Sequence, residues 1–336
     1  MKKIKVGLTG LGRIGKVHLK SLVHRLPEVE VLAVSDPVPE TKEVAATFGI
    51  PTFYDDFQDV VNHPGIDAVI LCSPTPTHLE YIEIAAKAGK DIFCEKPLDM
   101  TVAKIQAIDE IVRKHGVKLQ VGFNRRFDAD FAAVKNKVVS GQIGDPQLLR
   151  LTSRDPGPPP IEYIKSSGGL FLDMTIHDFD MARFIVGSEV TEVYAQGAVL
   201  VDENIGKAGD IDTAIIQLKF ENGAIGAIDN SRKSVYGYDQ RVEIFGSGGM
   251  SLNANHHPDT SMHFDEAGRH GPPALHFFVE RYAEAYFAEM KAFVEAVMTN
   301  KPVPVGSFDA LMATKIAVAA QISVKENRPV KIAEIV

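Results

Sequence analysis

The chain has 336 residues, of which 45% are hydrophobic and 24% charged, and its formal net charge at pH 7 is -8. This composition is typical of a globular protein long enough for two packed domains, and it argues against disordered and fibrous classes. The acidic balance provides no basic field to hold nucleic acid or an anionic membrane, so we expect small molecules or other protein chains as partners.

Cysteine usage and the N-terminus favour a reducing compartment. Cys72 and Cys94 are the two cysteines, and both end apolar runs, which favours buried thiols over a disulfide framework or a metal cluster. Met1-Lys2-Lys3 leads straight into a predicted strand and a glycine loop, which predicts no signal peptide. No stretch approaches the roughly 20 apolar residues of a membrane span. We therefore expect a cytoplasmic protein.

Short apolar runs alternate with helical patterns over the first third of the chain. The predicted strands are Ile4–Thr9, Val29–Ser35, Ala68–Cys72, Asp91–Cys94 and Lys118–Gly122. The predicted helices are Lys16–Arg25, Pro39–Phe48, Thr77–Ala88 and Val102–His115, with Gly89 and Gly116 as C-terminal caps. Because strands separated by helices are joined by right-handed crossovers, this order predicts a parallel, doubly wound sheet.

The pattern changes after about Asn124. A helix through Ser140, a Pro-rich loop at Asp155–Pro160 and a helix at Leu170–Val186 come first. Runs with strand character follow at Glu189–Leu200, Thr213–Phe220, Ala224–Ser231 and Arg241–Leu252, with a hairpin turn at Glu221-Asn222-Gly223. The region Asn253–Pro273 is predicted to be an irregular loop, and a helix at Phe308–Lys325 precedes a short strand at Pro329–Ile332. These elements predict an α+β region with a large, mainly antiparallel open sheet.

A glycine-rich loop opens the first predicted helix. It reads Gly10-Leu11-Gly12-Arg13-Ile14-Gly15, a GxGxxG sequence directly after the first predicted strand. Its glycines allow a tight turn, close approach of the backbone to a pyrophosphate and close packing of helix on strand, so all six residues are predicted to contact a dinucleotide.

Asp36 ends the second predicted strand about 20 residues beyond the loop, the spacing of an acidic ribose-binding residue. A carboxylate there accepts hydrogen bonds from the adenosine ribose hydroxyls and repels a 2′-phosphate, so we expect NAD. Two alternatives are open: Arg13 or a nearby lysine admits NADP, or Asp36 only caps a turn with Pro37.

Ser73-Pro74-Thr75-Pro76-Thr77-His78 follows a predicted strand at its carboxyl end, where doubly wound sheets bind ligands. We expect Ser73, Thr75 and His78 to line the cofactor. The alternative is that Thr77 is a helix N-cap and His78 a surface residue.

Glu95-Lys96-Pro97 follows the next predicted strand in the same way. We expect Glu95 and Lys96 near the cofactor, and the positive charge of Lys96 would favour an alkoxide over an alcohol. A solvated lysine is the plain alternative.

Asp173 and His177 are spaced i, i+4 on a predicted helix, so their side chains are expected to share a face. A carboxylate beside an imidazole raises the basicity of the ring and holds it in place, which suits a general base near neutral pH. An exposed charge pair is one alternative and a metal site is another, which His256-His257 keeps open although spacing indicates no third ligand. No GxSxG elbow supports a serine hydrolase.

Taken together, the Gly10–Gly15 loop, Asp36, Glu95-Lys96-Pro97 and the Gly-Gly-x-x-x-Asp-x-x-x-His helix resemble the Gfo/Idh/MocA oxidoreductase family over nearly the whole chain. The resemblance implies a Rossmann dinucleotide-binding domain at residues 1–123. It implies a substrate-binding and oligomerisation α+β domain at residues 124–336, whose helix at 308–325 packs back on the first domain.

The resemblance also implies roles for three residues. His177 takes the hydroxyl proton, Asp173 orients and polarises it, and Lys96 stabilises the developing alkoxide as hydride leaves for the nicotinamide. No metal is needed.

Softer matches resemble the subgroup of the family that oxidises inositols. They are Phe123-Asn124-Arg125-Arg126-Phe127, the loop containing Arg154-Asp155, Tyr236, and Phe277 to Tyr282. They imply that Arg126, Asp155 and Tyr236 hydrogen-bond the hydroxyls of a polyol and that Tyr282 borders the nicotinamide. The expected substrate is myo-inositol or a stereoisomer, oxidised at a secondary alcohol.

Members of the family commonly assemble as dimers or tetramers through the open face of the second sheet. Alternating apolar residues such as Ile215, Leu218, Phe220, Ile225 and Ile228 need cover on one face, so a homotetramer is expected.

Two other functions compete with polyol oxidation. One is an NAD(P)-dependent dehydrogenase of an aldose or another sugar derivative. The other is a nonenzymatic dinucleotide-binding regulator of the same fold, against which the retention of Lys96, Asp173 and His177 argues.

Overall fold

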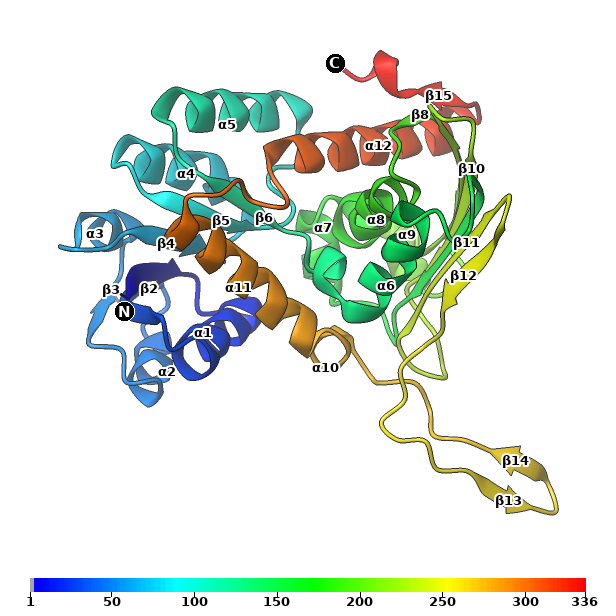
Figure 1. Ribbon diagram of the computed structural model, residues 1–336, viewed down its shortest axis with the longest axis horizontal. Helices are drawn as coiled ribbons and strands as arrows, with labels where there is room; N and C mark the ends of the chain where they lie inside the picture. Colours follow the sequence, from blue (N-terminus) through cyan, green and yellow to red (C-terminus); the bar gives the residue numbers. More distant parts are fainter. Residues whose placement is uncertain (1–2) are drawn as a thin grey trace. The chain divides into compact units, whose positions relative to one another are not determined.

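The computed structural model describes residues 3–336, which pack as two compact units (Figure 1). The first unit contains the described residues up to Phe127 together with Glu284–Thr314. The second contains Asp128–Ala283 and Lys315–Val336. The predicted division between residues 123 and 124 thus differs from the observed packing, because a late segment belongs with the first unit.

The first unit is built on a parallel sheet of six strands in the order β3-β2-β1-β4-β5-β6. The strands are β1 (Ile4–Thr9), β2 (Val29–Ser35), β3 (Thr52–Tyr54), β4 (Ala68–Leu71), β5 (Asp91–Glu95) and β6 (Leu119–Gly122). This order reverses direction between β1 and β4, where doubly wound sheets bind ligands at the carboxyl ends of their strands. The predicted Rossmann fold is confirmed.

Helices connect these strands and cover the sheet. They are α1 (Arg13–Arg25), α2 (Thr41–Thr47), α3 (Phe57–Asn62), α4 (His78–Lys87) and α5 (Val102–His115), with 3₁₀ turns η1 (Thr75–Thr77) and η2 (Asn124–Phe127). The short β3 and α3 were not predicted, because three and six residues are too few to show a clear periodicity.

A long helix, α11 (Ala283–Thr299), completes the core of the first unit. Met290, Phe293 and Val294 pack in one cluster with Leu8 of β1 and Phe93 of β5. Side chains of this size each contribute about 1.5–3 kcal/mol when buried. The helix α11 was not predicted. Its buried face includes the ionisable residue Glu289, which interrupts the apolar pattern expected of a buried helix face.

The second unit is built on a sheet of seven strands in the order β12-β11-β7-β10-β9-β8-β15. The strands are β7 (Pro146–Arg154), β8 (Val190–Ala198), β9 (Thr213–Phe220), β10 (Ile225–Ser231), β11 (Asp239–Gly246), β12 (Gly249–Asn253) and β15 (Val330–Lys331). All neighbours are antiparallel except the central pair β7 and β10, which confirms the mainly antiparallel sheet. The predicted run Arg241–Leu252 is two strands, and β7 was not predicted.

Helices of the second unit cover one face of this sheet (Figure 1). They are α6 (Ala129–Val139), α7 (Ile161–Ser166), α8 (Ile176–Val186), α9 (Glu203–Lys207) and α10 (Phe278–Arg281), with a π-helical turn η3 (Phe171–Thr175) and a 3₁₀ turn η4 (Ile332–Glu334). The apolar residues that were expected to need cover on one face of the sheet lie on both of its faces. Leu218, Phe220 and Ile228 are buried, whereas Ile215 and Ile225 are exposed, because successive side chains of a strand point to opposite faces.

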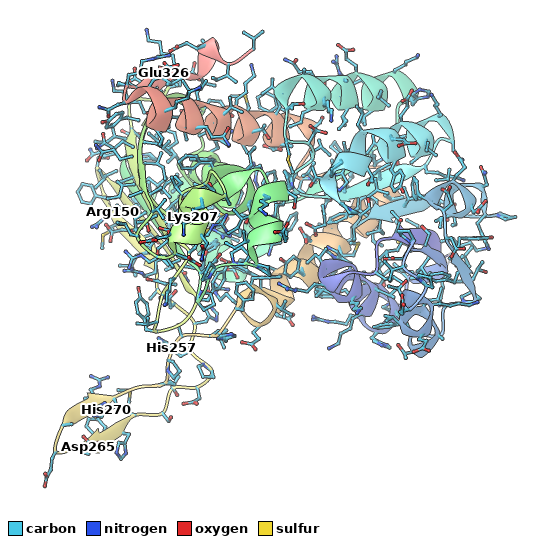
Figure 2. The ribbon with its side chains drawn as sticks, turned by 180° about the vertical axis from the view of Figure 1, so that it is seen from behind. Arg150, Lys207, His257, Asp265, His270 and Glu326 are labelled. Carbon is cyan, nitrogen blue, oxygen red and sulfur yellow. The ribbon has the colours of Figure 1, made fainter. Side chains whose placement is uncertain are left out.

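The predicted irregular loop at 253–273 contains a hairpin. Its strands β13 (His263–Asp265) and β14 (Gly268–His270) are exposed throughout and project from the rest of the second unit (Figure 1). Asp265 and His270 lie near its tip (Figure 2), and the ring Nε2 of His270 is 3.1 Å from a carboxylate oxygen of Asp265.

The helix α12 (Ser307–Glu326) begins in the first unit and ends in the second. Among residues 3–336 it is the one helix long and apolar enough to cross a membrane, and 44% of its most apolar window is buried in the protein. Its buried positions include Ala313, Ile316, Ala317 and Ala320, as in the core helix of a globular protein. This is weak evidence for a membrane span, and the cytoplasmic location stays a prediction.

Candidate active site

The glycine loop between β1 and α1 has the geometry that a dinucleotide requires. Gly10 has a φ of +88°, and a Cβ on Gly15 would lie 1.8 Å from the carbonyl oxygen of Gly10, so neither position accepts a side chain without distortion. A Cβ on Gly12 would meet nothing within 4 Å. The space over Gly12 lies at the N-terminus of a 13-residue helix, whose backbone N–H groups attract phosphate.

Asp36 ties the second strand to this loop. Its Oδ2 accepts a hydrogen bond from the N–H of Leu11 at 2.6 Å, and its Oδ1 accepts one from the N–H of Val38 at 2.9 Å. The carboxylate therefore caps a turn, which was the alternative to ribose binding considered for Asp36. Each carboxylate oxygen can accept a second hydrogen bond, so the capping role and ribose binding are compatible. Arg13 is exposed at the first position of α1.

His78 departs from the alternative expectation of a surface residue, and its predicted contact with the cofactor stays a prediction. Its ring is 1% exposed, so it is not a surface residue, and it contacts backbone on both sides. Nε2 lies 3.0 Å from the carbonyl oxygen of Ser73, and Nδ1 lies 3.1 Å from that of Pro97 and 3.3 Å from that of Leu98. Burial lowers the pKa of His78, although these backbone contacts oppose that effect. His78 thus joins the loop after β4 to the loop after β5.

The other residues of the first of these loops are less buried. The hydroxyls of Ser73 and Thr77 are 2.7 Å apart, and that of Thr77 also donates to the carbonyl of Pro74 at 2.8 Å. Thr77 therefore precedes α4 without capping it through its side chain. Thr75 is half-buried, and cofactor contacts of Ser73 and Thr75 stay predictions.

Lys96 follows β5 directly and is half-buried. Its backbone N–H donates to Oε2 of Glu95 at 3.2 Å. The other oxygen of Glu95 lies 2.6 Å from Nε2 of His18, a residue that the sequence analysis did not single out.

The thiols of Cys72 and Cys94 lie near this carboxylate. Cys94 is buried and Cys72 is half-buried. Burial raises the pKa of both thiols and Glu95 raises it further, so neither is an activated nucleophile.

Arg126 belongs to the 3₁₀ turn after β6. Its guanidinium donates to Oδ1 of Asp309 at 2.8 Å, and both side chains are largely buried. No sequence pattern indicated this ion pair, and a polyol contact of Arg126 stays a prediction.

Asp173 and His177 lie where the second unit changes from a π-helical turn to a regular helix. Asp173 is in the turn η3, His177 is in the first turn of α8, and both are half-buried. A π turn adds a residue to the helical repeat, so the i, i+4 relation of a regular helix does not describe this pair. Such turns occur often at functional sites.

Asp173 is held by two side chains that the sequence did not indicate. The hydroxyl of Tyr163 donates to its Oδ1 at 2.9 Å, and Nη1 of Arg232 donates to its Oδ2 at 3.1 Å. Arg232 is 1% exposed, and its Nη2 is 3.6 Å from Oδ2 of Asp210. The buried guanidinium of Arg232 thus lies between the carboxylates of Asp173 and Asp210.

The start of α8 is fixed by a further set of buried hydrogen bonds. The hydroxyl of Thr175 donates to Oδ1 of Asn230 at 2.7 Å, and the amide of Asn230 donates to Oδ2 of Asp178 at 2.9 Å. These bonds attach the helix to β10.

Tyr236 and Asp155, the residues of the second unit predicted to bind the hydroxyls of a polyol, have hydrogen-bond partners within the protein. The hydroxyl of Tyr236 accepts from Arg154 at 3.0 Å and donates to Asp239 at 2.6 Å, and the backbone N–H of Asp155 donates to the carbonyl of Ser231 at 2.9 Å. Substrate contacts of Tyr236 and Asp155 stay predictions.

Tyr282 is 1% exposed, and its hydroxyl is 3.4 Å from Oε1 of Gln240. Its ring packs near those of Phe131 and Tyr238. Tyr282 packs among these side chains, and its predicted border with the nicotinamide stays a prediction.

The metal alternative has little support at this helix. His256 contacts Asp130, and Nδ1 of His257 lies 3.0 Å from the carbonyl of Pro272. Within residues 3–336, one set of His, Cys, Asp and Glu side chains brings three ligand atoms together, and it is His18, Glu95 and Glu289 of the first unit.

Comparison with known proteins agrees with this geometry. Residues 4–123 match the family described as "Oxidoreductase family, NAD-binding Rossmann fold", and residues 131–251 match the "GFO/IDH/MocA C-terminal domain". NAD as the cofactor is therefore confirmed.

The similarity to individual proteins extends over the full length. A myo-inositol 2-dehydrogenase of Thermotoga maritima is 47% identical over 99% of this chain and 100% of its own length. An inositol 2-dehydrogenase of Rhizobium meliloti is 43% identical over 98% and 99%. The crystal structure of scyllo-inositol dehydrogenase from Lactobacillus casei with bound NAD(H) and scyllo-inositol is 34% identical, with a TM-score of 0.93 over 99% of this chain and 100% of that chain. On this similarity, the chain belongs to the Gfo/Idh/MocA family of oxidoreductases.

Proposed function

We propose that this protein oxidises a secondary alcohol of a cyclic polyol, myo-inositol or a stereoisomer, to the corresponding ketone. The observation that carries the proposal is the end-to-end similarity to inositol dehydrogenases, one of which has been solved with both NAD(H) and an inositol. Lys96, Asp173 and His177 are all present in this chain, which supports an enzyme over a nonenzymatic regulator of the same fold.

The cofactor and the protein have separate tasks in this reaction. Bound NAD supplies the hydride acceptor. The loop over Gly12 would hold its pyrophosphate, and Asp36 would accept hydrogen bonds from its ribose hydroxyls.

The protein side chains handle the proton and the developing charge. When the carbinol C–H leaves as hydride, the O–H proton must leave too, and neutral His177 accepts it as general base. Lys96 stabilises the negative charge that develops on oxygen. Asp173, which accepts hydrogen bonds from Tyr163 and Arg232, orients and polarises His177.

A polyol panel tests the reaction directly. The purified protein is mixed with NAD or NADP and with inositol stereoisomers, aldoses and amino sugars at alkaline pH, and reduced cofactor is followed by absorbance. We expect turnover with an inositol and NAD, and slower turnover with NADP because Asp36 repels the 2′-phosphate. Binding of NADH without turnover of any polyol or sugar would contradict the proposal and favour a regulator. Turnover of aldoses alone would favour the sugar dehydrogenase.

The role of Lys96 is tested by Lys96→Met, with Lys87→Met as the control. Lys87 is an exposed lysine of α4, paired with Glu83 on the same helix. We expect Lys96→Met to lower kcat while NADH affinity holds, and Lys87→Met to behave as wild type. A loss of NADH affinity with an unchanged kcat would show that Lys96 binds the cofactor and does not act on the alcohol.

We also propose that the chain forms a homo-oligomer, a tetramer by the expectation above, through the uncovered face of the second sheet. Four exposed apolar residues lie side by side across four strands of this face: Ile225, Leu148, Phe245 and Met250. A contiguous exposed apolar row of this kind marks an interaction surface.

A further inference from the structure

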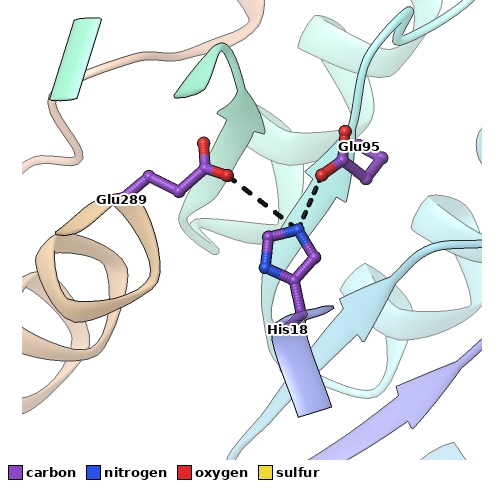
Figure 3. Close-up of side chains that lie close together, drawn as sticks. All are labelled: His18, Glu95 and Glu289. Atoms are coloured by element: carbon purple, nitrogen blue, oxygen red, sulfur yellow. Dashed lines mark hydrogen bonds and ion pairs between the residues drawn. The ribbon is translucent and has the colours of Figure 1, made fainter. Parts of the chain in front are cut away.

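Three titratable side chains meet in the interior of the first unit, and the reaction scheme gives none of them a chemical step. His18 comes from α1, Glu95 from the end of β5 and Glu289 from α11 (Figure 3). His18 and Glu289 are 0% exposed, and Glu95 is 7% exposed. Nε2 of His18 points between the two carboxylates, 2.6 Å from Oε1 of Glu95 and 3.9 Å from Oε1 of Glu289.

The two carboxyl groups have different surroundings. Within residues 3–336, neither side-chain oxygen of Glu289 has a hydrogen-bond partner. An ionised carboxylate buried in this way is strongly disfavoured. Burial raises the pKa of Glu289 well above its usual 4.5, and the charge of Glu95 raises it further.

The groups that face Glu289 do not reverse this effect. They are His18 from α1, Glu95 from β5 and the thiol of Cys72 after β4, and the ring of Tyr286 packs against His18 from the side of α11. No lysine or arginine is among these groups. Burial without a hydrogen-bond partner therefore favours the neutral form of Glu289.

A proton, and not a metal ion, accounts for the geometry. The three ligand atoms lie within 4.8 Å of one another, which would admit a cation by distance alone. Two ligands of one tetrahedral zinc ion lie about 3.3 Å apart, since each bond is about 2.0–2.1 Å long. The 2.6 Å between His18 and Glu95 is shorter and is that of a charge-assisted hydrogen bond.

The Glu95 carboxylate has two hydrogen-bond partners and lies against a glycine. Oε1 accepts from His18, and Oε2 accepts from the backbone N–H of Lys96 at 3.2 Å. A Cβ on Gly122 would lie 2.9 Å from Oε2, so the absence of a side chain there leaves room for the carboxylate. The next residues of the chain are held by His78 through the carbonyls of Pro97 and Leu98.

We propose that His18 and Glu289 are positioning residues for Lys96. Neutral Glu289 leaves a single negative charge in the cluster, on Glu95. His18 fixes one oxygen of this carboxylate, and the other oxygen accepts the hydrogen bond from the N–H of Lys96. The lysine is thereby held in one place at the carboxyl end of β5. The inference rests on the proposed function in one respect, because it is the catalytic use of Lys96 that makes its position matter.

The charge of Glu289 can be measured without any activity. The infrared difference spectrum of wild type minus Glu289→Gln should contain the C=O stretching band of a neutral carboxyl group. A carboxylate band in its place would overturn the assignment. Elemental analysis of the purified protein should find no stoichiometric divalent metal, and a bound metal that Glu289→Gln removes would overturn it equally.

The activity of the same variant gives a second measure. Glutamine has the shape of a neutral glutamic acid, so Glu289→Gln should retain more of the wild-type kcat than Glu289→Leu, which removes the polar group. A large loss of kcat would mean that Glu289 acts as an anion.

The positioning role is tested by His18→Leu, with His24→Leu as the control on an exposed face of the same helix. We expect His18→Leu to lower kcat at least about tenfold, which corresponds to about 1.4 kcal/mol in the activation free energy. NADH affinity, measured by fluorescence, should be unchanged. His18→Gln, which restores a donor, should recover part of the loss. If His18→Leu does not fold, Glu95→Gln replaces it, with the same expected fall in kcat. An unchanged kcat in the folded variant would overturn the positioning role.

Failure of the proposed function would look different. A wild-type protein that oxidises no polyol contradicts the reaction, whereas the infrared spectrum still decides the charge of Glu289.

Discussion

Single buried ionisable residues show two ways in which this fold accommodates charge. Arg232 is 1% exposed and is compensated by Asp173 at 3.1 Å and by Asp210 at 3.6 Å. Glu289 is 0% exposed, neither of its side-chain oxygens has a hydrogen-bond partner within residues 3–336, and burial raises its pKa toward the neutral form. Both solutions follow from the high cost of an uncompensated charge in the interior.

Replacing Arg232 with methionine should destabilise the protein, because two carboxylates would then face each other without a cation. We expect a loss of about 3 kcal/mol in the free energy of unfolding, the usual cost of breaking a buried pair, and a fall in kcat/KM through Asp173. Urea unfolding and steady-state kinetics measure both. The control is Arg328→Met, a surface arginine paired with Glu326 and Glu334, for which less than about 1 kcal/mol is expected. Equal losses in the two variants would contradict the compensating role of Arg232.

Glu289→Gln should stabilise the folded protein as pH rises. The pKa of Glu289 is raised on folding, so its contribution to stability is complete below the unfolded value near 4.5 and is lost as pH increases through the folded value. Glutamine does not ionise and avoids this loss. Urea unfolding should therefore show Glu289→Gln more stable than wild type at neutral and mildly alkaline pH, with a difference that shrinks toward pH 4.5. A difference independent of pH would argue against a neutral Glu289.

At the scale of elements, the glycine loop separates the needs of folding from those of binding. Gly10 and Gly15 have no room for a side chain, because a Cβ would meet backbone atoms at 2.5 Å or less. Gly12 has open space, so its lack of a side chain serves nothing in the fold itself. The space at Gly12 leaves room at the N-terminus of α1, and the approach of a pyrophosphate there stays a prediction.

Gly12→Ala should keep the melting temperature of the unliganded protein while weakening NADH binding by about tenfold or more, since about 1.4 kcal/mol corresponds to a factor of ten. Gly15→Ala is the contrasting variant and should lower the melting temperature. Calorimetric titration with NADH and thermal unfolding distinguish the two. An unchanged affinity in Gly12→Ala would place the pyrophosphate elsewhere.

At the scale of the whole molecule, one face of the second sheet carries a row of exposed apolar side chains on adjacent strands. Ile225, Leu148, Phe245 and Met250 are between 36% and 51% exposed although they stand in register on adjacent strands. Apolar side chains on adjacent strands are ordinarily covered by another layer.

Ile225→Arg should therefore dissociate the oligomer while leaving the fold of each chain intact. Light scattering should give a mass above 36.6 kDa for wild type and close to it for the variant, with unchanged circular dichroism. Val139→Arg, at an exposed position on α6, is the matched control and should keep the wild-type mass. A wild type that is already monomeric would contradict the proposed assembly.

Local sequence determined the parts of this protein that depend on short spacings. The parallel strands, the glycine loop and Asp36, and the change to an antiparallel sheet were predicted because periodicity and turn residues act over a few positions. Lys96, Asp173 and His177 were selected by ordered motifs, and their catalytic roles stay predictions.

Tertiary structure decided everything that joins distant segments. The helix α11 packs with β1 and β5, and its Glu289 meets His18 across 271 positions of the chain. Arg232 reaches Asp173 from the loop after β10, and His78 is buried between two loops instead of facing solvent. No local pattern reports such contacts, because the energy of a buried charge depends on which side chains the folded chain brings beside it.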